Sequence, residues 1–274
     1  MLTDNSKQVL FGSLFGDGSL YLNKNGINAL YEEDHSLKQK DYLLWKKPFF
    51  EEISPVKVTE YSYFDERTGK RYYHIRVRTR VSSLLTDLHK VLYIDGRKTV
   101  PPLILNQIDT LGLAVLYFDD GDYCYQNRRA KISTHSFSLE ENELIKNYLL
   151  DQFELETMIY PMRSGYELRF NSNSTKRLLS LIENYTPECL FYKLGRDNER
   201  EKDARLKARL WEERNKDKRL TQWYGWRDAN RERYLELKRA CHHRHRDKNL
   251  ARQRMYYHLH RDEINARRRR NRDG

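Results

Sequence analysis

The stretch Leu10–Ser19 (LFGSLFGDGS) has a second version later in the chain, Leu113–Asp122 (LAVLYFDDGD). In each version an apolar run leads to an aspartate that is followed by a glycine. Apolar runs of this length are typical of buried helices, and an Asp-Gly pair commonly ends a helix with the glycine in the left-handed conformation. A single version predicts only a turn. Two versions predict two core helices, each ending at a carboxylate, Asp17 in the first and Asp120 in the second.

The sequence that follows each version is also repeated. After the first version, periodicity predicts short strands within 20–31, a helix over 36–53, strands at 58–64 and 72–79, and a helix over 82–92. After the second version, the same order is predicted over 123–135, 139–153, 156–162, 166–171 and 174–185. The order α-β-β-α-β-β-α therefore occurs twice, as an internal repeat of about 100 residues. The predicted fold class is mixed α and β, with two pseudo-symmetric halves over 1–106 and 107–195.

Charge is distributed unevenly along the chain. Residues 1–195 carry 25 basic and 26 acidic side chains, whereas residues 196–274 carry 26 and 14. This asymmetry predicts a domain boundary near Gly195 and a basic C-terminal extension over 196–274 that binds phosphate groups. A solvated helical surface is the alternative interpretation of the same charges.

The extension contains four imperfect repeats of 15 residues, in which Trp211 aligns with Trp226. One continuous helix and several short helices joined at polar segments both fit this pattern. The histidines of the extension are a second feature, and they are His242, His243, His245, His258 and His260. Because Cys241 is the only nearby thiol, phosphate contact or disorder in the absence of nucleic acid is expected here rather than a metal site.

Composition excludes several other classes of protein. The three cysteines, Cys124, Cys189 and Cys241, lie far apart without a CxxC spacing, so neither a disulfide framework nor a zinc ribbon is predicted. We expect a reducing, intracellular setting, which can be bacterial, phage or organellar. Residues 1–7 lack the apolar segment of a signal peptide, and no apolar run approaches the roughly 20 residues that cross a bilayer. A soluble protein without a membrane partner is therefore expected.

Several phrases of the sequence together resemble the LAGLIDADG homing endonucleases, in their single-chain form with two motifs. Besides the two motifs, the phrases are His35–Leu43 (HSLKQKDYL), Gly96–Pro101 (GRKTVP), Ser133–Ser138 (STHSFS) and Phe191–Leu194 (FYKL). They cover about residues 9–195, and their combination is specific whereas one motif alone is weak. The resemblance implies a monomer with an internal pseudo-two-fold axis, whose two antiparallel sheets form a saddle over double-stranded DNA. It also implies a double-strand break at a long, asymmetric site.

In this fold the two motif helices pack side by side between the halves, and close packing needs small residues. Gly12 and Gly16, four residues apart, supply such a face on the first helix. The corresponding residues of the second helix are Val115 and Asp119. The predicted helix interface, which includes Gly12, Gly16 and Val115, is therefore asymmetric.

The resemblance implies that Asp17 and Asp120 converge near the scissile phosphates and hold Mg²⁺, with Mn²⁺ as a substitute. Gly16 and Asp119 belong to the same predicted metal site, although Asp119 is interpreted mainly as a supporting or packing residue. A calcium loop over 119–122 is disfavoured because the glycine and glutamate spacing of an EF-hand is absent.

Two lysines occupy equivalent places, each shortly after the last helix of its half. Lys98 and Lys193 match lysines to which the family assigns stabilisation of the transition state or ordering of the water. An ordinary surface charge is the alternative for a lysine beside a turn. The matched pair favours the catalytic role.

Sequence recognition is expected from the strands. Over 72–80 one face is apolar and the other carries His74, Arg76, Arg78 and Arg80, and a two-stranded ribbon of this kind fits the major groove. In the second half, the predicted DNA-contacting strand residues are Lys131, Ser133, His135, Arg169 and Asn171. The predicted loop contacts are Asn23, Lys24, Asn25, Asn127, Arg128 and Arg129. A half-exposed sheet without a ligand is the alternative.

Two other functions remain open. An intron-encoded RNA maturase uses the same saddle for intron RNA and needs neither aspartate. A DNA-binding protein whose catalytic ability has lapsed is the third possibility, but retention of both aspartates and both lysines argues against it.

Overall fold

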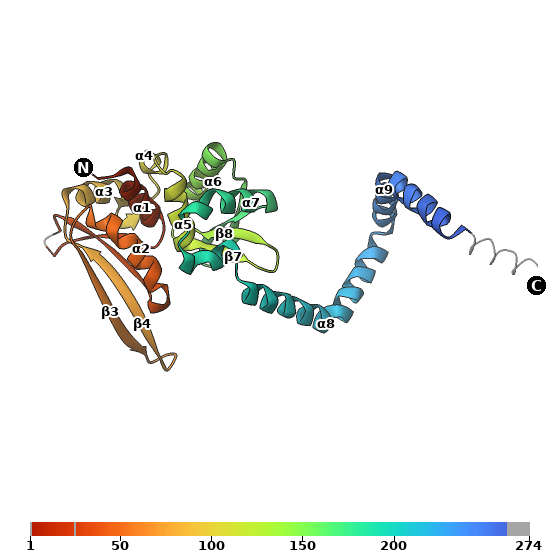
Figure 1. Cartoon of the computed structure of the whole chain (residues 1–274), viewed down its shortest axis with the longest axis horizontal. Coiled ribbons are helices and arrows are strands. Elements are labelled where there is room, and N and C mark those ends of the chain that lie inside the picture. The colour runs from red at the N-terminus through yellow and green to blue at the C-terminus, as the bar shows by residue number, and fades with distance from the viewer. Residues whose placement is uncertain (1, 25, 262–274) are drawn as a thin grey trace, which may run out of the picture. The chain divides into compact units, whose positions relative to one another are not determined.

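The computed structural model describes residues 2–24 and 26–261. Its internal contacts divide the chain into two units, Met1–Lys207 and Ala208–Gly274. The first unit contains two halves that each consist of one motif helix, a four-stranded sheet and covering helices (Figure 1). The motif helices α1 and α5 pack against each other at the centre of this unit.

The first half begins with α1 (Asp4–Phe15) and contains an antiparallel sheet. Its strands are β1 (Ser19–Leu22), β2 (Ala29–Ser36), β3 (Val56–Asp65) and β4 (Lys70–Thr79), in the order β1-β2-β4-β3. The helices α2 (Lys40–Glu51, after the 3-10 turn η1 at Leu37–Gln39) and α3 (Ser83–Leu92) complete it. The short pair β5 (Tyr93–Ile94) and β6 (Arg97–Lys98) and the turn α4 (Pro102–Leu105) lead to the second half.

The second half repeats this arrangement. The helix α5 (Thr110–Asp120) precedes β7 (Gly121–Cys124), β8 (Arg129–Ser133), α6 (Leu139–Phe153), β9 (Thr157–Met162), β10 (Gly165–Phe170) and α7 (Ser172–Ile182). The 3-10 segments η2 (Glu183–Tyr185) and η3 (Glu188–Leu194) follow. Its strand order, β7-β8-β10-β9, is the order of the first sheet, and all pairs in both sheets are antiparallel. The predicted double α-β-β-α-β-β-α order is therefore confirmed.

At Gly12 and Gly16 the two motif helices lie so close together that no side chain would fit between them. A Cβ atom at Gly12 would lie 2.4 Å from the carbonyl oxygen of Gly112, and one at Gly16 would lie 2.6 Å from the Cβ of Asp119. Val115 also borders this contact, since its Cβ would lie 2.8 Å from a Cβ atom added at Gly12. Both helices therefore contribute small residues, because Gly112, which the sequence pattern did not single out, lies opposite Gly12.

The expectation of a left-handed glycine at the end of each motif is wrong. Gly121 has φ −81°, Gly16 has φ −100°, and Gly18 is not among the glycines with positive φ. Close contact explains the glycines instead. A Cβ at Gly18 would lie 2.4 Å from the hydroxyl of Tyr31, and one at Gly121 would lie 2.2 Å from the carbonyl oxygen of Tyr117. The motif glycines thus make room for tyrosines of the core.

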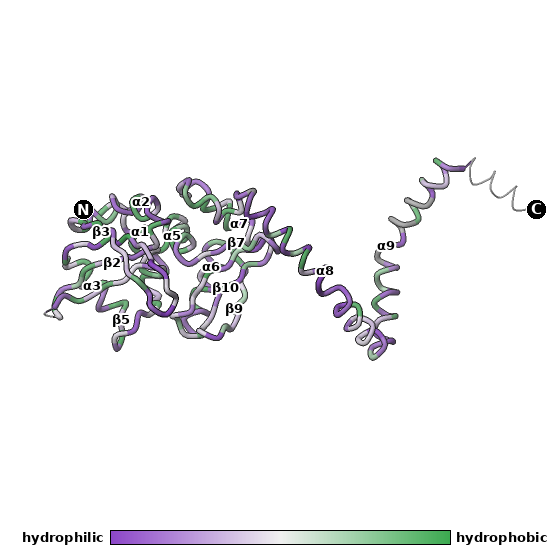
Figure 2. Tube along the Cα trace, turned by 90° about the horizontal axis from the view of Figure 1, so that it is seen from below, coloured by the Kyte–Doolittle hydropathy of each residue, from purple (hydrophilic) through white to green (hydrophobic). Residues whose placement is uncertain are grey.

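The C-terminal extension forms two long helices, α8 (Asn198–Ala229) and α9 (Arg231–Leu259). The helical structure is interrupted at Asn230, whereas residues 215–217, which lie one 15-residue repeat earlier, continue within α8. Figure 2 shows both helices as largely hydrophilic with scattered hydrophobic residues. Among the described residues, no helix has the length and apolar composition that a bilayer crossing requires.

The first turns of α8 belong to the first unit. The guanidinium of Arg200 lies 4.2 Å from the centre of the Tyr192 ring, and Arg128 forms an ion pair of 3.0 Å with Glu201. The boundary expected near Gly195 is a backbone turn with φ 74°, but contacts continue to Lys207.

Candidate active site and nucleic-acid face

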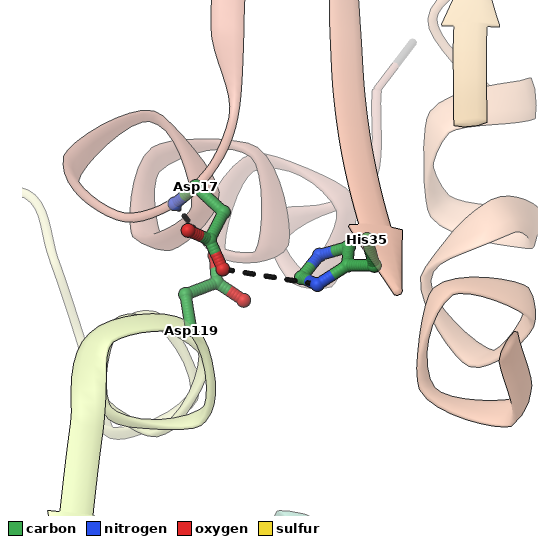
Figure 3. Close-up of side chains that lie close together, drawn as sticks. All are labelled: Asp17, His35 and Asp119. Atoms are coloured by element: carbon green, nitrogen blue, oxygen red, sulfur yellow. Dashed lines mark hydrogen bonds and ion pairs between the residues drawn. The ribbon is translucent and has the colours of Figure 1, made fainter. Parts of the chain in front are cut away.

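Two carboxylates emerge where the motif helices end. Asp17 follows α1 directly after its cap Gly16, and its side chain is 38% exposed, whereas Asp120 is the last residue of α5 and is half-buried. The neighbouring Asp119 is buried and turned toward the first half. Its Oδ2 accepts a hydrogen bond of 3.3 Å from the backbone N–H of Asp17 (Figure 3). The two motifs therefore meet at the ends that carry Asp17 and Asp120.

The two predicted lysines contact the two motif ends in equivalent ways. Lys98 Nζ donates to the carbonyl oxygens of Gly16 and Gly18, each at 3.0 Å, and so contacts the backbone on both sides of Asp17. Lys193 Nζ donates to the carbonyls of Phe118 and Asp119, the latter at 3.1 Å, directly before Asp120. Each lysine thus binds the carbonyl that precedes the carboxylate of its own half.

Burial shifts the protonation of these groups. Burial raises the pKa of Asp120 to about 7, and the negative charges of Asp17 and Asp119 act in the same direction. Burial also lowers the pKa of Lys98 and of Lys193, although nearby aspartates oppose the effect. Such shifts are typical of sites that transfer protons or bind ions. Within residues 2–24 and 26–261, the Asp120 carboxylate accepts no hydrogen bond, so its oxygens are available to a cation.

A cluster of buried charged and polar side chains lies behind the first motif, and it was not predicted from the sequence. We call Glu33, His35, Tyr42, Lys46 and Asp119 the buried cluster. Lys46 Nζ lies 2.7 and 2.9 Å from the two oxygens of Asp119 and 2.6 Å from Glu33 Oε1. Tyr42 donates to Asp119 Oδ1 at 2.6 Å, and His35 Nε2 lies 2.5 Å from Glu33 Oε1. A lysine on the buried face of α2 is the one sequence signal that could have indicated such a cluster.

Mutual pairing sets the charge states of the buried cluster. Burial alone raises the pKa of Glu33, but the positive charge of Lys46 and the contact with His35 outweigh it and lower this pKa to about 2. Burial alone lowers the pKa of His35 and of Lys46, but their carboxylate partners outweigh it and raise both values. Burial raises the pKa of Asp119 to about 6, although Lys46 opposes the rise. The carboxyl groups of Glu33 and Asp119 therefore raise the pKa of both Lys46 and His35.

Asp17, His35 and Asp119 bring one potential ligand atom each within 4.8 Å of one another, and no other such group occurs in the described part of the chain. Figure 3 shows the three side chains directed toward one another. His35 Nδ1 lies 3.8 Å from Asp17 Oδ2. Because both oxygens of Asp119 already accept hydrogen bonds from protein groups, Asp17 offers the more accessible oxygens.

The basic face predicted for β4 is present, and acidic side chains accompany it. Ile75, Val77 and Thr79 are buried, whereas Arg78 and Arg80 are exposed and His74 and Arg76 are half-buried. Asp34 on β2 lies 2.7 Å from His74 Nδ1 and 2.9 Å from Arg76 Nε. Glu32 lies 3.4 Å from Arg78 Nε. These carboxylates hold the basic side chains in place and reduce the net positive charge of the face.

The sheet of the second half carries a groove of about 510 Å³, lined by residues that include Lys131, Tyr160 and Arg169. The buried Glu167 accepts a hydrogen bond of 2.9 Å from Lys131 and one of 2.6 Å from Arg169 Nε. The Arg169 guanidinium lies 3.4 Å from the centre of the Tyr160 ring. Two predicted basic residues of this half therefore converge on one groove.

The remaining predicted contacts divide between surface and structural positions. Ser133 is half-buried on β8, His135 contacts Ser164 at 2.8 Å, and Lys24 and Arg129 are exposed. Asn23 and Asn127 each accept backbone hydrogen bonds within their own turns, and Arg128 pairs with Glu201. Asn171 caps α7 by accepting from Ser174 N and also donates to Glu156, which reduces its capacity for base contacts. Asn25 lies outside the described residues.

Several proteins are similar to this chain. The DNA endonuclease I-ChuI of Chlamydomonas applanata is 26% identical over 212 residues, which are 72% of this chain and 97% of that protein. The cytochrome b mRNA maturase bI2 of Debaryomyces hansenii is 24% identical over 69% of this chain and 72% of its own length. Protein RecA of Mycolicibacterium chitae is 25% identical over 70% of this chain and 47% of its own length. The chain thus spans about half the length of the RecA relatives that it matches.

A solved structure has the same fold. The homing endonuclease I-WcaI bound to its DNA recognition sequence superimposes with a TM-score of 0.64 at 21% identity, over 71% of this chain and 87% of that chain. Residues 7–178, more than half of the chain, match the LAGLIDADG DNA endonuclease family. The two motif helices and the two similar sheets are consistent with this sequence match. The chain therefore belongs to the LAGLIDADG DNA endonuclease family.

Proposed function

We propose that this protein is a site-specific homing endonuclease that makes a metal-dependent double-strand break in a long, asymmetric DNA target. One observation carries the proposal. Asp17 and Asp120 lie at the ends of packed helices, and Lys98 and Lys193 contact the carbonyl that precedes each of them. A doubled carboxylate and lysine arrangement suits the cleavage of two strands. Because one chain supplies both motifs, we propose that the protein acts as a monomer.

The residues present fit a divalent cation. Carboxylate oxygens are the ligands that Mg²⁺ prefers, and Mn²⁺ accepts the same ligands. Asp17 has an exposed carboxylate, and Asp120 has one that is half-buried, raised in pKa and without a hydrogen-bond donor among the described residues. Asp17 and Asp120 would hold the cation, while the buried cluster supports Asp119 beside them. When bound, the cation supplies a coordinated water of lowered pKa and neutralises charge on the phosphate oxygens.

Lys98 and Lys193 supply fixed positive charge at each motif end. Their ammonium groups are held by backbone carbonyls and do not form ion pairs among the described residues. A preorganised cation stabilises negative charge that develops on the phosphate in the transition state. We assign this role to both lysines, and we assign retention of a water near Asp17 and Asp120 to the carboxylates.

The strands support recognition of an asymmetric site. The β3–β4 hairpin has ten residues in each strand, whereas β9 and β10 have six. The first half therefore presents a longer basic face, with Arg76 and Arg78, than the second half, with Lys131 and Arg169. A longer ribbon reaches more base pairs of the major groove. We expect the two half-sites to differ in length as well as in sequence.

The C-terminal extension has features suited to additional affinity for DNA. Its two helices carry basic side chains with exposed aromatics such as Trp211, Trp223 and Tyr256. Arg227 lies over the rings of both Trp223 and Tyr224, so its guanidinium is held near the helix surface. We propose that this basic extension contacts backbone phosphates outside the core site.

An RNA maturase is the second candidate, and one observation favours it. Tyr61, Tyr63, Tyr72 and His74 form a strip of rings on the β3–β4 hairpin, with neighbouring ring centres 5.3 to 5.7 Å apart. Tyr63 is 47% exposed and Tyr72 is 37% exposed, which leaves ring faces available for stacking. Exposed rings suit unpaired bases, which are the usual targets of sequence-specific RNA recognition.

Cleavage of a partly random duplex library tests the proposal. The full chain is incubated with Mg²⁺ or with EDTA, and the newly formed ends are captured and sequenced. We expect one asymmetric consensus that is cut on both strands in Mg²⁺ only. Absence of cutting, or cutting without sequence preference, contradicts the proposal. Absence of cutting together with accelerated splicing of an intron RNA supports the maturase instead.

A further inference from the structure

The buried cluster joins the two halves directly behind the candidate active site. Lys46 and Tyr42 lie on α2 of the first half, whereas Asp119 lies on α5 of the second half. The side chain of Lys46 is 0% exposed, and its ammonium contacts both oxygens of Asp119. Charged groups are removed from water only at a large desolvation cost, so an arrangement of this kind needs a reason beyond filling space.

The contacts of Asp119 lead to Asp17. Its Oδ1 accepts from Tyr42 and Lys46, and its Oδ2 accepts from Lys46 and from the backbone N–H of Asp17. The backbone of Asp17 is held on its other side by Lys98, through the carbonyls of Gly16 and Gly18. The position of the Asp17 carboxylate therefore depends on an acceptor whose own orientation is set by two side chains of α2.

Residues 107–195, all of which the structure describes, contain no equivalent of this arrangement. The backbone N–H groups of Ala29 and Ala130 each donate to a threonine hydroxyl, Thr86 and Thr175, so the two residues occupy equivalent places. Four residues further on, Glu33 corresponds to Thr134.

Thr134 donates to Asn142 of α6, and both of these side chains are neutral. The residue of the first motif that corresponds to Asp119 is Gly16, which has no side chain. A neutral pair is therefore sufficient for packing in the second half. The charged contacts in the first half indicate a role other than packing.

We propose that Lys46 and Tyr42 are positioning residues that act on cleavage through Asp119, by fixing the acceptor that orients Asp17. This inference rests on the proposed endonuclease function. Neither residue touches the substrate face, since both side chains are buried beneath the first motif. Loss of either contact is therefore expected to slow cleavage without weakening DNA binding.

The chain offers a matched pair of variants for the test. Tyr42→Phe removes the hydroxyl that donates to Asp119, and Tyr148→Phe removes a buried hydroxyl on α6 that donates to the carbonyl of Ile108. Both changes delete one buried oxygen and leave the ring in place. In the full chain, Tyr42→Phe is expected to lower the single-turnover cleavage rate about tenfold, the lower end of the effect of removing a supporting contact. Tyr148→Phe is expected to leave this rate unchanged.

DNA affinity in EDTA and the melting temperature separate positioning from general damage. Both variants are expected to bind the target as the wild type does and to melt at similar temperatures. Equal cleavage rates of Tyr42→Phe and Tyr148→Phe would overturn the inference. So would a loss of cleavage in Tyr42→Phe that is fully explained by weaker DNA binding.

A double-mutant comparison with Asp119→Ala provides a second test. If Tyr42 acts through Asp119, then Tyr42→Phe should have no further effect on the rate in an Asp119→Ala background, which lacks the acceptor. Losses that multiply would show an independent action of Tyr42. If Asp119→Ala does not fold, the comparison of Tyr42→Phe with Tyr148→Phe still tests the inference.

The backbone amide of Asp17 gives a reporter that needs neither metal nor substrate. Its proton donates to Asp119, so its NMR chemical shift is expected to change in Tyr42→Phe and not in Tyr148→Phe. An amide signal that is insensitive to Tyr42→Phe contradicts this inference. A wild-type protein that cuts no duplex while the amide responds contradicts the proposed function instead.

Discussion

The carboxylate of Asp119, in the second motif, accepts a hydrogen bond from the backbone of Asp17, in the first, at 3.3 Å. This contact is possible because Gly16 has no side chain, since a Cβ there would lie 2.6 Å from both the Cβ and Oδ2 of Asp119. The two halves are therefore connected at the same point where their carboxylates emerge. Changes in helix packing are expected to reach the candidate active site through this contact.

Gly12→Ala tests the packing of the motif helices. The added methyl group would lie 2.4 Å from the carbonyl of Gly112 and 2.8 Å from the Cβ of Val115, so the helices must separate. Overpacking of this kind lowers the free energy of unfolding by about 1 to 3 kcal/mol. Each kcal/mol lowers the melting temperature of a unit of this size by about 2 to 4 °C, which calorimetry can measure.

Gly225→Ala is the control for this change. Gly225 lies inside α8, and nothing lies within 4 Å of a Cβ added there. Because alanine favours an exposed helix by about 1 kcal/mol relative to glycine, this variant should be neutral or more stable. Equal melting temperatures of Gly12→Ala and the wild type would show that the helices tolerate separation.

The repeat made most of the fold predictable from sequence. Local periodicity and the doubled motif were sufficient for the element order, and α6 has the predicted bounds, Leu139–Phe153. The conformation of the motif glycines was not predictable, because Gly18 and Gly121 respond to tyrosines that approach them in three dimensions. An Asp-Gly pair in sequence does not distinguish a left-handed turn from a close contact.

Asp120→Asn is predicted to stabilise the metal-free protein in a pH-dependent way. In the folded protein the pKa of Asp120 is raised from 3.8 to about 7, so ionisation of the folded state is disfavoured. The resulting destabilisation is absent below about pH 4, grows as the pH rises toward 7, and is constant above it. Asp120→Asn removes it and should therefore stabilise the protein more at about pH 8 than at about pH 5, by on the order of 2 kcal/mol.

Thermal or urea unfolding in EDTA at both pH values measures this difference. Asp122→Asn is the control, because Asp122 is exposed two residues further along the chain. A stabilisation by Asp120→Asn that is the same at both pH values would contradict the raised pKa of Asp120.

Arg78→Ala is predicted to reduce specificity at one or two base pairs. Arg78 is exposed on β4 and is oriented by Glu32, at 3.4 Å from its Nε. Loss of a bidentate contact with guanine should reduce the preference for the cognate base by roughly 1 to 3 kcal/mol. Affinities for a panel of singly substituted DNA targets measure this preference. Weakening that is uniform across the panel would instead indicate that Arg78 contacts a phosphate.

Removal of the basic extension is predicted to change the salt dependence of binding. A chain that ends at Lys207 keeps Arg200 on Tyr192 and Glu201 on Arg128, whereas one that ends at Gly195 loses both contacts. The longer chain should fold and cut the target at low salt. Each lost phosphate contact should reduce the slope of log affinity against log salt by about 0.9 on duplex DNA. An unchanged slope would show that the extension does not contact DNA.

The candidate site was predictable only in part, and the reason is physical. Asp17, Asp120, Lys98 and Lys193 stand next to recognisable motifs, so a sequence comparison finds them. Lys46 and Glu33 come together only through packing, since 13 residues and a change of element separate them. Asp34 and Glu32, which pair with the predicted basic face, follow from the antiparallel register of β2 and β4. Such register is a tertiary property that no single segment encodes.

Double-strand cleavage by Asp17→Asn and Asp120→Asn tests the central claim most directly. Each change removes one oxygen of the proposed metal site but almost no contact area. We predict that neither variant makes a double-strand break in Mg²⁺, that both bind the selected target in EDTA nearly as tightly as the wild type, and that Asp122→Asn cuts normally. Full double-strand cleavage by either Asp17→Asn or Asp120→Asn would contradict the assignment of these two carboxylates as the catalytic pair.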